Sequence, residues 1–165
     1  MEKLFDEYPE RAKEKFIEMC IEINSLAELK ELIKLGFDLR DYEFLDRAFV
    51  NSCASDSIDI PLFFLDEGAN INANNGQALV RTVRYKQWDN FQMLLNRGIE
   101  MTPYNISQIL YQPGYKKALE MLLAHGINKQ LVTKLLFEGL IKNTNHKDSI
   151  NFLINNGADL NNLGF

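Results

Sequence analysis

The residues Leu94-Leu95-Asn96-Arg97-Gly98 are one copy of a pattern that recurs along the chain. In each copy an apolar pair stands four and three positions before a glycine, and an acidic or amide residue stands two positions after it. The glycines are spaced 28 to 32 residues apart and are Gly36, Gly68, Gly98, Gly126 and Gly157. Such a period is typical of a repeat protein, in which small units stack on their neighbours.

A second set of apolar residues opens another helical face in each copy, 19 to 23 residues before the glycine: Phe16, Leu45, Leu79, Ile106 and Leu136. Apolar or small residues follow three and four positions later, as the buried stripe of a helix requires. In the first copy this predicts that Phe16, Met19 and Cys20 face the core. Each unit is therefore predicted to be a pair of short helices.

Capping and turn residues mark the ends of these helices. Ser25 with Glu28 predicts a capping box, and Thr102 followed by Pro103 predicts a second helix start. The repeated glycines are expected in the left-handed conformation that ends a helix. Asn75-Gly76 predicts a hairpin-like turn between two units.

The second half of each unit resembles the L-L-x-x-G-A-D-x-N signature of ankyrin repeats, as in the residues 65–72 (LDEGANIN) and 153–161 (LINNGADLN). The resemblance implies an all-α, ankyrin-like solenoid of helix-turn-helix repeats with short finger turns. It covers residues 1–165 as a single domain with approximate units 9–40, 41–72, 73–102, 103–130 and 131–162. No histidine occupies the family's T-P-L-H position, where this chain has Thr102-Pro103-Tyr104-Asn105. The hydrogen bonds that this histidine makes between repeats must be absent or replaced.

Composition excludes several classes of protein. The net charge of −5 disfavours nucleic-acid binding, because phosphates require a basic surface. No apolar run approaches the eighteen or so residues of a membrane span, and the charged N-terminus lacks a secretory signal. Cys20 and Cys53 lie on helical patterns and are expected to be reduced core thiols. We expect a soluble, cytoplasmic protein.

Motifs for catalysis are missing from the sequence. There is no glycine-rich phosphate loop, nucleophile elbow or zinc-protease helix. His125 is expected to complement the carbonyl end of a helix, and Trp88 to pack at the start of another. We expect no catalytic residues, no cofactor and no bound metal.

The family resemblance implies two binding surfaces, the finger turns and the outer side of the first helices. If positions i, i+3 and i+4 are buried, i+2, i+5 and i+6 form a groove, which includes Glu18, Ile21, Glu22 and Asn51. From both surfaces we select as partner-binding residues Arg47, Asn74, Asn75, Arg81, Arg84, Tyr85, Tyr104 and Tyr111. Arginine and tyrosine are common interface anchors, so an acidic segment of a partner protein is expected. Alternatively, the arginines pair with neighbouring acids of the same chain.

The sequence thus predicts a monomeric, non-enzymatic protein-protein interaction module. An alternative is an adaptor subunit that recruits a target to a separate enzyme such as a ubiquitin ligase. A helical-repeat nucleic-acid binder is disfavoured by the acidic charge. Degenerate repeats of this kind resemble those of intracellular bacteria and large DNA viruses, and by analogy a role inside a host cell is expected.

Overall fold

The computed structural model describes residues 10–35, 37, 39, 42–134, 151, 152, 154 and 155. Within these ranges all regular secondary structure is helical, which confirms the all-α prediction. The bounded helices are α1 (Glu10–Glu22), α2 (Leu26–Lys34), α3 (Tyr42–Ser52), α4 (Asp59–Asp66), α5 (Ala73–Tyr85), α6 (Trp88–Asn96), α7 (Pro103–Leu110) and α8 (Tyr115–Ala124). Residues 129–134 are also helical.

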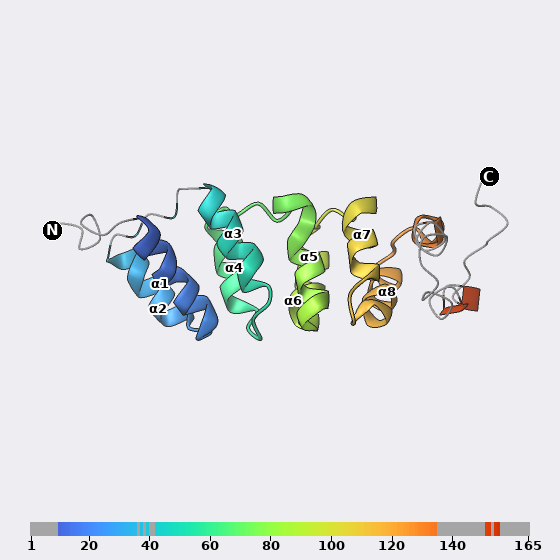
Figure 1. The fold of residues 1–165 in the computed structure, drawn as a ribbon, viewed down its shortest axis with the longest axis horizontal. Coiled ribbons are helices and arrows are strands. Elements are labelled where there is room, and N and C mark those ends of the chain that lie inside the picture. The colour runs from blue at the N-terminus through green and yellow to red at the C-terminus, as the bar shows by residue number, and fades with distance from the viewer. Residues whose placement is uncertain are drawn as a thin grey trace.

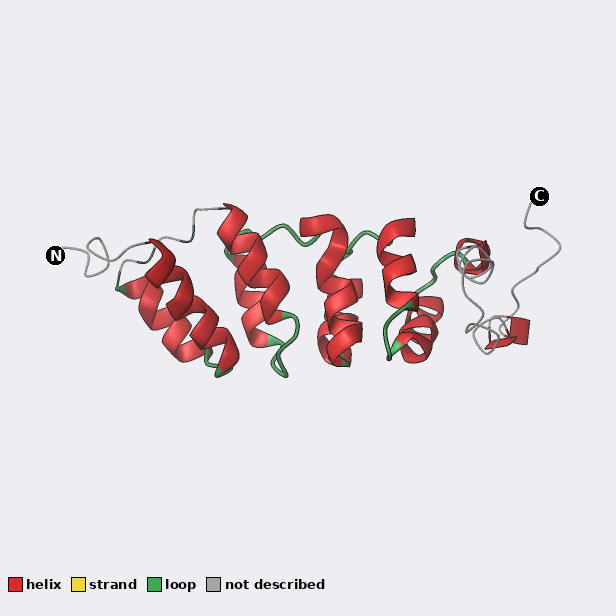
Figure 2. Ribbon diagram, in the orientation of Figure 1, coloured by secondary structure: helices red, strands yellow, loops and turns green. Residues whose placement is uncertain are grey.

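The helices form pairs that stand side by side in a row (Figure 1). Helix α1 packs on α2, α3 on α4, α5 on α6 and α7 on α8. The first helix of each pair also contacts the first helix of the next, so that α1, α3, α5 and α7 make one continuous layer. The loops from α4 to α5 and from α6 to α7 run along the same edge of the row (Figure 2).

The recurring glycine ends the second helix of a pair through two backbone hydrogen bonds. Gly98 has φ of 80° and donates to the Leu95 carbonyl at 3.1 Å, while Ile99 donates to the Leu94 carbonyl at 3.1 Å. Leu94 and Ile99 are both buried, as expected for a Schellman motif with its apolar contact. The same two bonds occur at Gly68 and Gly126. The sequence pattern is therefore a helix terminator whose apolar residues also belong to the core.

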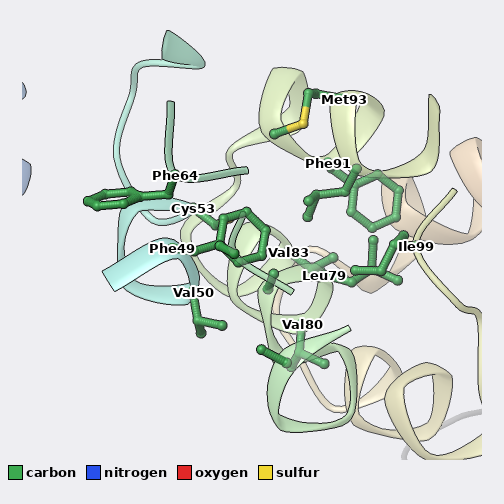
Figure 3. Packing of buried hydrophobic residues seen from close by; sticks show 14 of the residues in the cluster. Phe49, Val50, Cys53, Phe64, Leu79, Val80, Val83, Phe91, Met93 and Ile99 are labelled. Carbon is green, nitrogen blue, oxygen red and sulfur yellow. The ribbon is translucent and has the colours of Figure 1, made fainter. Parts of the chain in front are cut away.

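A continuous apolar core runs along the row between the first and the second helices of the pairs. Phe49 of α3, Leu79 and Val83 of α5, and Phe91 of α6 are completely buried (Figure 3). The inward positions predicted for α3, α5 and α7 are all buried: Leu45, Ala48, Phe49, Leu79, Thr82, Val83, Ile106, Ile109 and Leu110. Leu136 and the positions that follow it lie outside the described residues.

The buried face of α1 is displaced by one residue from the predicted one. Phe16 and Met19 are 38% and 48% exposed, whereas Ile17 and Cys20 are 0% and 5% exposed. Two overlapping stripes satisfy the helical spacing in this helix, and the structure buries Ile17, Cys20 and Ile21. Because α1 packs against a neighbouring pair on one side, through α3, its register is less constrained than that of an internal helix.

One predicted cap is confirmed and one is wrong. The Thr102 hydroxyl accepts a hydrogen bond from the Asn105 backbone N–H at 3.2 Å, with Pro103 in the first turn of α7. Ser25 precedes α2, but its side chain makes no capping bond. Its backbone N–H instead donates to the Cys20 carbonyl at 2.9 Å, so the tight connection from α1 fixes its position.

The turn predicted at Asn75-Gly76 is present, but it does not have the form of a hairpin. Asn74, Asn75 and Gly76 have φ of 51°, 58° and 73° and form one left-handed turn at the start of α5. A hairpin turn requires two strands to join, and the described chain contains none on either side. Asparagine and glycine tolerate left-handed backbone, so the same residues reverse the chain into a helix instead.

Side-chain amides link neighbouring units. Asn72 Oδ1 accepts from the Glu100 N–H at 2.9 Å, and Asn105 Nδ2 donates to the Glu100 carbonyl at 2.6 Å. Gln87 Nε2 donates to the Ala54 carbonyl at 3.1 Å. These amides therefore connect residues of successive pairs of helices.

Candidate functional site

The candidate site is a cleft of about 510 Å³ that crosses the first three pairs of helices. Its walls come from the C-terminal halves of α1, α3 and α5 and from the loops that follow α1 and α3. The lining residues are Glu18, Ile21, Glu22, Asn24, Asn51, Ala54, Ser55, Asp56, Arg81 and Tyr85. A volume of this size is within the range of ligand-binding pockets in proteins.

The helical spacing in the sequence predicted the lining residues that lie on helices. Six residues placed on the groove by the sequence do line the cleft: Glu18, Ile21, Glu22, Asn51, Arg81 and Tyr85. Val50, at the corresponding i+5 position of α3, is only 4% exposed and belongs to the core. The structure thus brings together residues from three units that are about 30 positions apart in sequence.

Arg81, Arg84 and Tyr85 form a cation–aromatic cluster at the end of α5. The guanidinium carbons of Arg81 and Arg84 lie 5.6 Å and 5.9 Å from the centre of the Tyr85 ring, which is 49% exposed. The Nε of Arg81 is buried and has no hydrogen-bond partner. A buried donor without an acceptor carries a desolvation cost within the fold.

Three carboxylates also line the cleft. Glu18 pairs with Lys15 of the same helix at 3.4 Å, and Asp56 accepts from Gln87 Nε2 at 2.8 Å. Glu22 makes no ion pair with any residue that the structure describes. Sequence reasoning missed Asp56, because this residue lies in the loop after α3 and the helical spacing rule covers helices alone.

The other predicted partner-binding residues lie outside the cleft. Arg47 pairs with Glu14 at 2.8 Å and lies over the Phe44 ring at 5.5 Å, so it is engaged within the chain. Asn74 and Asn75 are exposed on the left-handed turn before α5. Tyr104 and Tyr111 are exposed at the two ends of α7.

The two thiols are buried, as predicted, and their chemistry is that of core residues. Burial raises the pKa of Cys53 far above its ordinary value, and the nearby positive charge of Arg81 opposes this only in part. Burial, with the charge of Glu28, also raises the pKa of Cys20. Since the thiolate is the reactive form, neither cysteine is activated as a nucleophile.

Among the described residues, no three histidine, cysteine, aspartate or glutamate side chains are grouped so as to hold a metal ion.

Trp88 begins α6 and packs edge-on against Phe91, with Lys117 over its ring at 4.8 Å. His125 follows the last turn of α8. The cleft itself offers charged groups, amides and the ring of Tyr85 for binding.

Comparison with protein-family models, curated proteins and solved structures finds no match for this chain. Across the part of the chain that the structure describes, no helix combines the length and apolar character that a membrane span needs. The interpretation of the cleft therefore depends on its own geometry.

Proposed function

We propose that the chain is an ankyrin-like solenoid that acts as a non-enzymatic protein-protein interaction module. It binds a partner protein through the strip formed by α1, α3 and α5 and through the turns between pairs. The observation that carries this proposal is the cleft, which draws its walls from three consecutive units. Repeat arrays commonly bind extended partners along such a surface.

The composition of the cleft supports binding to a protein. Tyr85 and Arg81 are residue types enriched at interaction hot spots, and they lie together at one end of the cleft. Ala54 provides a small apolar surface, while Asn24 provides an amide to a polar chain. This mixture of an aromatic anchor with polar groups resembles the interfaces of proteins that associate reversibly.

The proposal is tested by affinity capture from cell lysate with the intact chain and a groove variant, Arg81→Ala/Arg84→Ala/Tyr85→Ala, which removes side chains without adding an acidic group. A matched control, Lys30→Ala/Lys34→Ala, removes two exposed charges of α2, and circular dichroism verifies that each variant is folded. We expect at least one protein to be retained by the intact chain and the control, and to be lost from the groove variant.

If Arg81→Ala disturbs the core beside Cys53, the milder pair Arg84→Ala/Tyr85→Ala replaces it in the same comparison. Equal retention by all variants would move the binding surface away from α5. Retention of no protein by the intact chain would contradict the interaction function.

A further inference from the structure

The charges that face the cleft are predominantly negative. Glu18, Glu22 and Asp56 line it, against the single guanidinium of Arg81. Two other basic residues that the sequence assigned to the groove, Arg47 and Arg84, are not part of the lining, and Arg47 is paired with Glu14. Glu18 is paired with the exposed Lys15, so Glu22 and Asp56 are the carboxylates without a basic partner among the described residues. The cleft therefore carries the opposite sign of charge from the basic groove that the sequence predicts.

The ends of two helices add to this negative potential. α1 ends at Glu22 and α3 ends at Ser52, and residues that follow both helices, Asn24 and Ser55, line the cleft. Neither helix has a basic residue in its last turn, in contrast to α2 and α5. The last carbonyls of both helices, such as those of Ile21 and Ser52, accept backbone hydrogen bonds, so what remains is the field of the helix dipole, which favours a nearby cation. The helix ends and the carboxylates thus favour the same kind of ligand.

We infer, on the basis of the proposed interaction function, that the cleft binds a basic segment of a partner protein. A lysine or arginine of that segment lies between Glu18, Glu22 and Asp56. The exposed ring of Tyr85 packs against the same segment. The acidic partner expected from the sequence stays a prediction and becomes the opposing outcome of the test.

A peptide fits this cleft better than a free cation does. Asn24 and Asn51 line the cleft with amides that can bond to the N–H and C=O groups of a peptide backbone. The half-exposed ring of Tyr85 provides apolar surface that a small hydrated ion leaves unused. A segment with a cationic side chain and a backbone uses the carboxylates, the amides and the ring together.

The test uses fluorescence anisotropy with labelled nine-residue peptides of glycine, serine and tyrosine. One set carries lysine or arginine at positions 4 and 6, and a counterpart set carries glutamate there. Each set is titrated with the intact chain and with a cleft variant, Glu18→Gln/Glu22→Gln/Asp56→Asn. A control variant, Glu67→Gln/Glu100→Gln/Glu120→Gln, removes the same charge from residues that do not line the cleft.

At about 0.15 M salt, where long-range attraction is screened beyond roughly 8 Å, we expect the intact chain to prefer the basic peptides at least tenfold. The cleft variant should lose about tenfold in affinity for them, which corresponds to about 1.4 kcal/mol. The control variant should stay within about twofold, because screening removes most of the contribution of distant charges.

Four results would overturn the inference: a preference for glutamate peptides, equal losses in the cleft and control variants, no binding of any peptide, or equal competition by free spermidine. Lysate capture separates this inference from the proposed function. A partner held through Arg84 and Tyr85 together with a failed peptide test would refute only the basic segment. Failure of both experiments would refute the interaction function as well.

Discussion

Replacing Gly76 with alanine tests the left-handed turn that begins α5. At φ of 73° an alanine costs about 1 to 2 kcal/mol, because its Cβ crowds the following carbonyl oxygen. The new Cβ would also lie 2.6 Å from Asn105 Nδ2. Asn105 is completely buried and bonded to the Glu100 carbonyl, so it yields only at the cost of overpacking, about 1 to 3 kcal/mol. Together these effects lower the free energy of unfolding by about 2 to 5 kcal/mol.

Gly98 provides the matched control, because its φ is 80° but no atom lies within 4 Å of an added Cβ. Gly98→Ala should cost only the conformational part, about 1 to 2 kcal/mol. Urea unfolding followed by circular dichroism measures both variants from the shift of the midpoint at constant slope. In an Asn105→Ala background, Gly76→Ala should fall to the cost of Gly98→Ala. Equal costs for the two glycines in the native background would refute the steric argument.

Three further predictions concern the core, a cap and pH. Leu94→Ala removes a completely buried side chain and should cost about 2 to 5 kcal/mol in urea unfolding; a loss below 1 kcal/mol would contradict its place in the core. Thr102→Ala should lower the melting temperature by more than Ser25→Ala, since only Thr102 makes a capping bond, worth about 1 kcal/mol. The pKa of Cys53 is raised by burial, so above about pH 9 the unfolded chain loses this proton while the folded chain keeps it. Stability should then fall by up to about 1.4 kcal/mol per pH unit relative to Cys53→Ala, and parallel pH profiles of the two proteins would contradict this.

The sequence predicted the central part of the fold well because local and tertiary constraints agree there. Helices α3, α5 and α7 each contact a first helix of a neighbouring pair, and the apolar spacing matches their buried faces. In α1 two apolar stripes overlap, and spacing alone could not distinguish Phe16 from Ile17. At Asn75-Gly76 the residues reveal a left-handed backbone, but whether strands or helices follow depends on the rest of the chain.

The sequence predicted the lining residues of the cleft that lie on helices, but not the excess of carboxylates over guanidinium groups in that lining. The spacing rule identified Arg81 and Tyr85 on α5, and Glu18 and Glu22 on α1, as residues of one strip. It gave no weight to the loop residue Asp56 or to the ends of α1 and α3. The sign of a local electrostatic potential depends on distances between units, which no single helix pattern contains.

The amide links between units have a consequence for the conditions in which the array holds its shape. Asn72 and Asn105 bind the Glu100 backbone, and Gln87 binds the Ala54 carbonyl, through groups that neither gain nor lose a proton near neutral pH. A histidine in the same role would become charged between about pH 6 and 7. Acidification to about pH 5, as in an endosome, therefore leaves these couplings intact, and the units should stay aligned where a histidine-linked array would loosen.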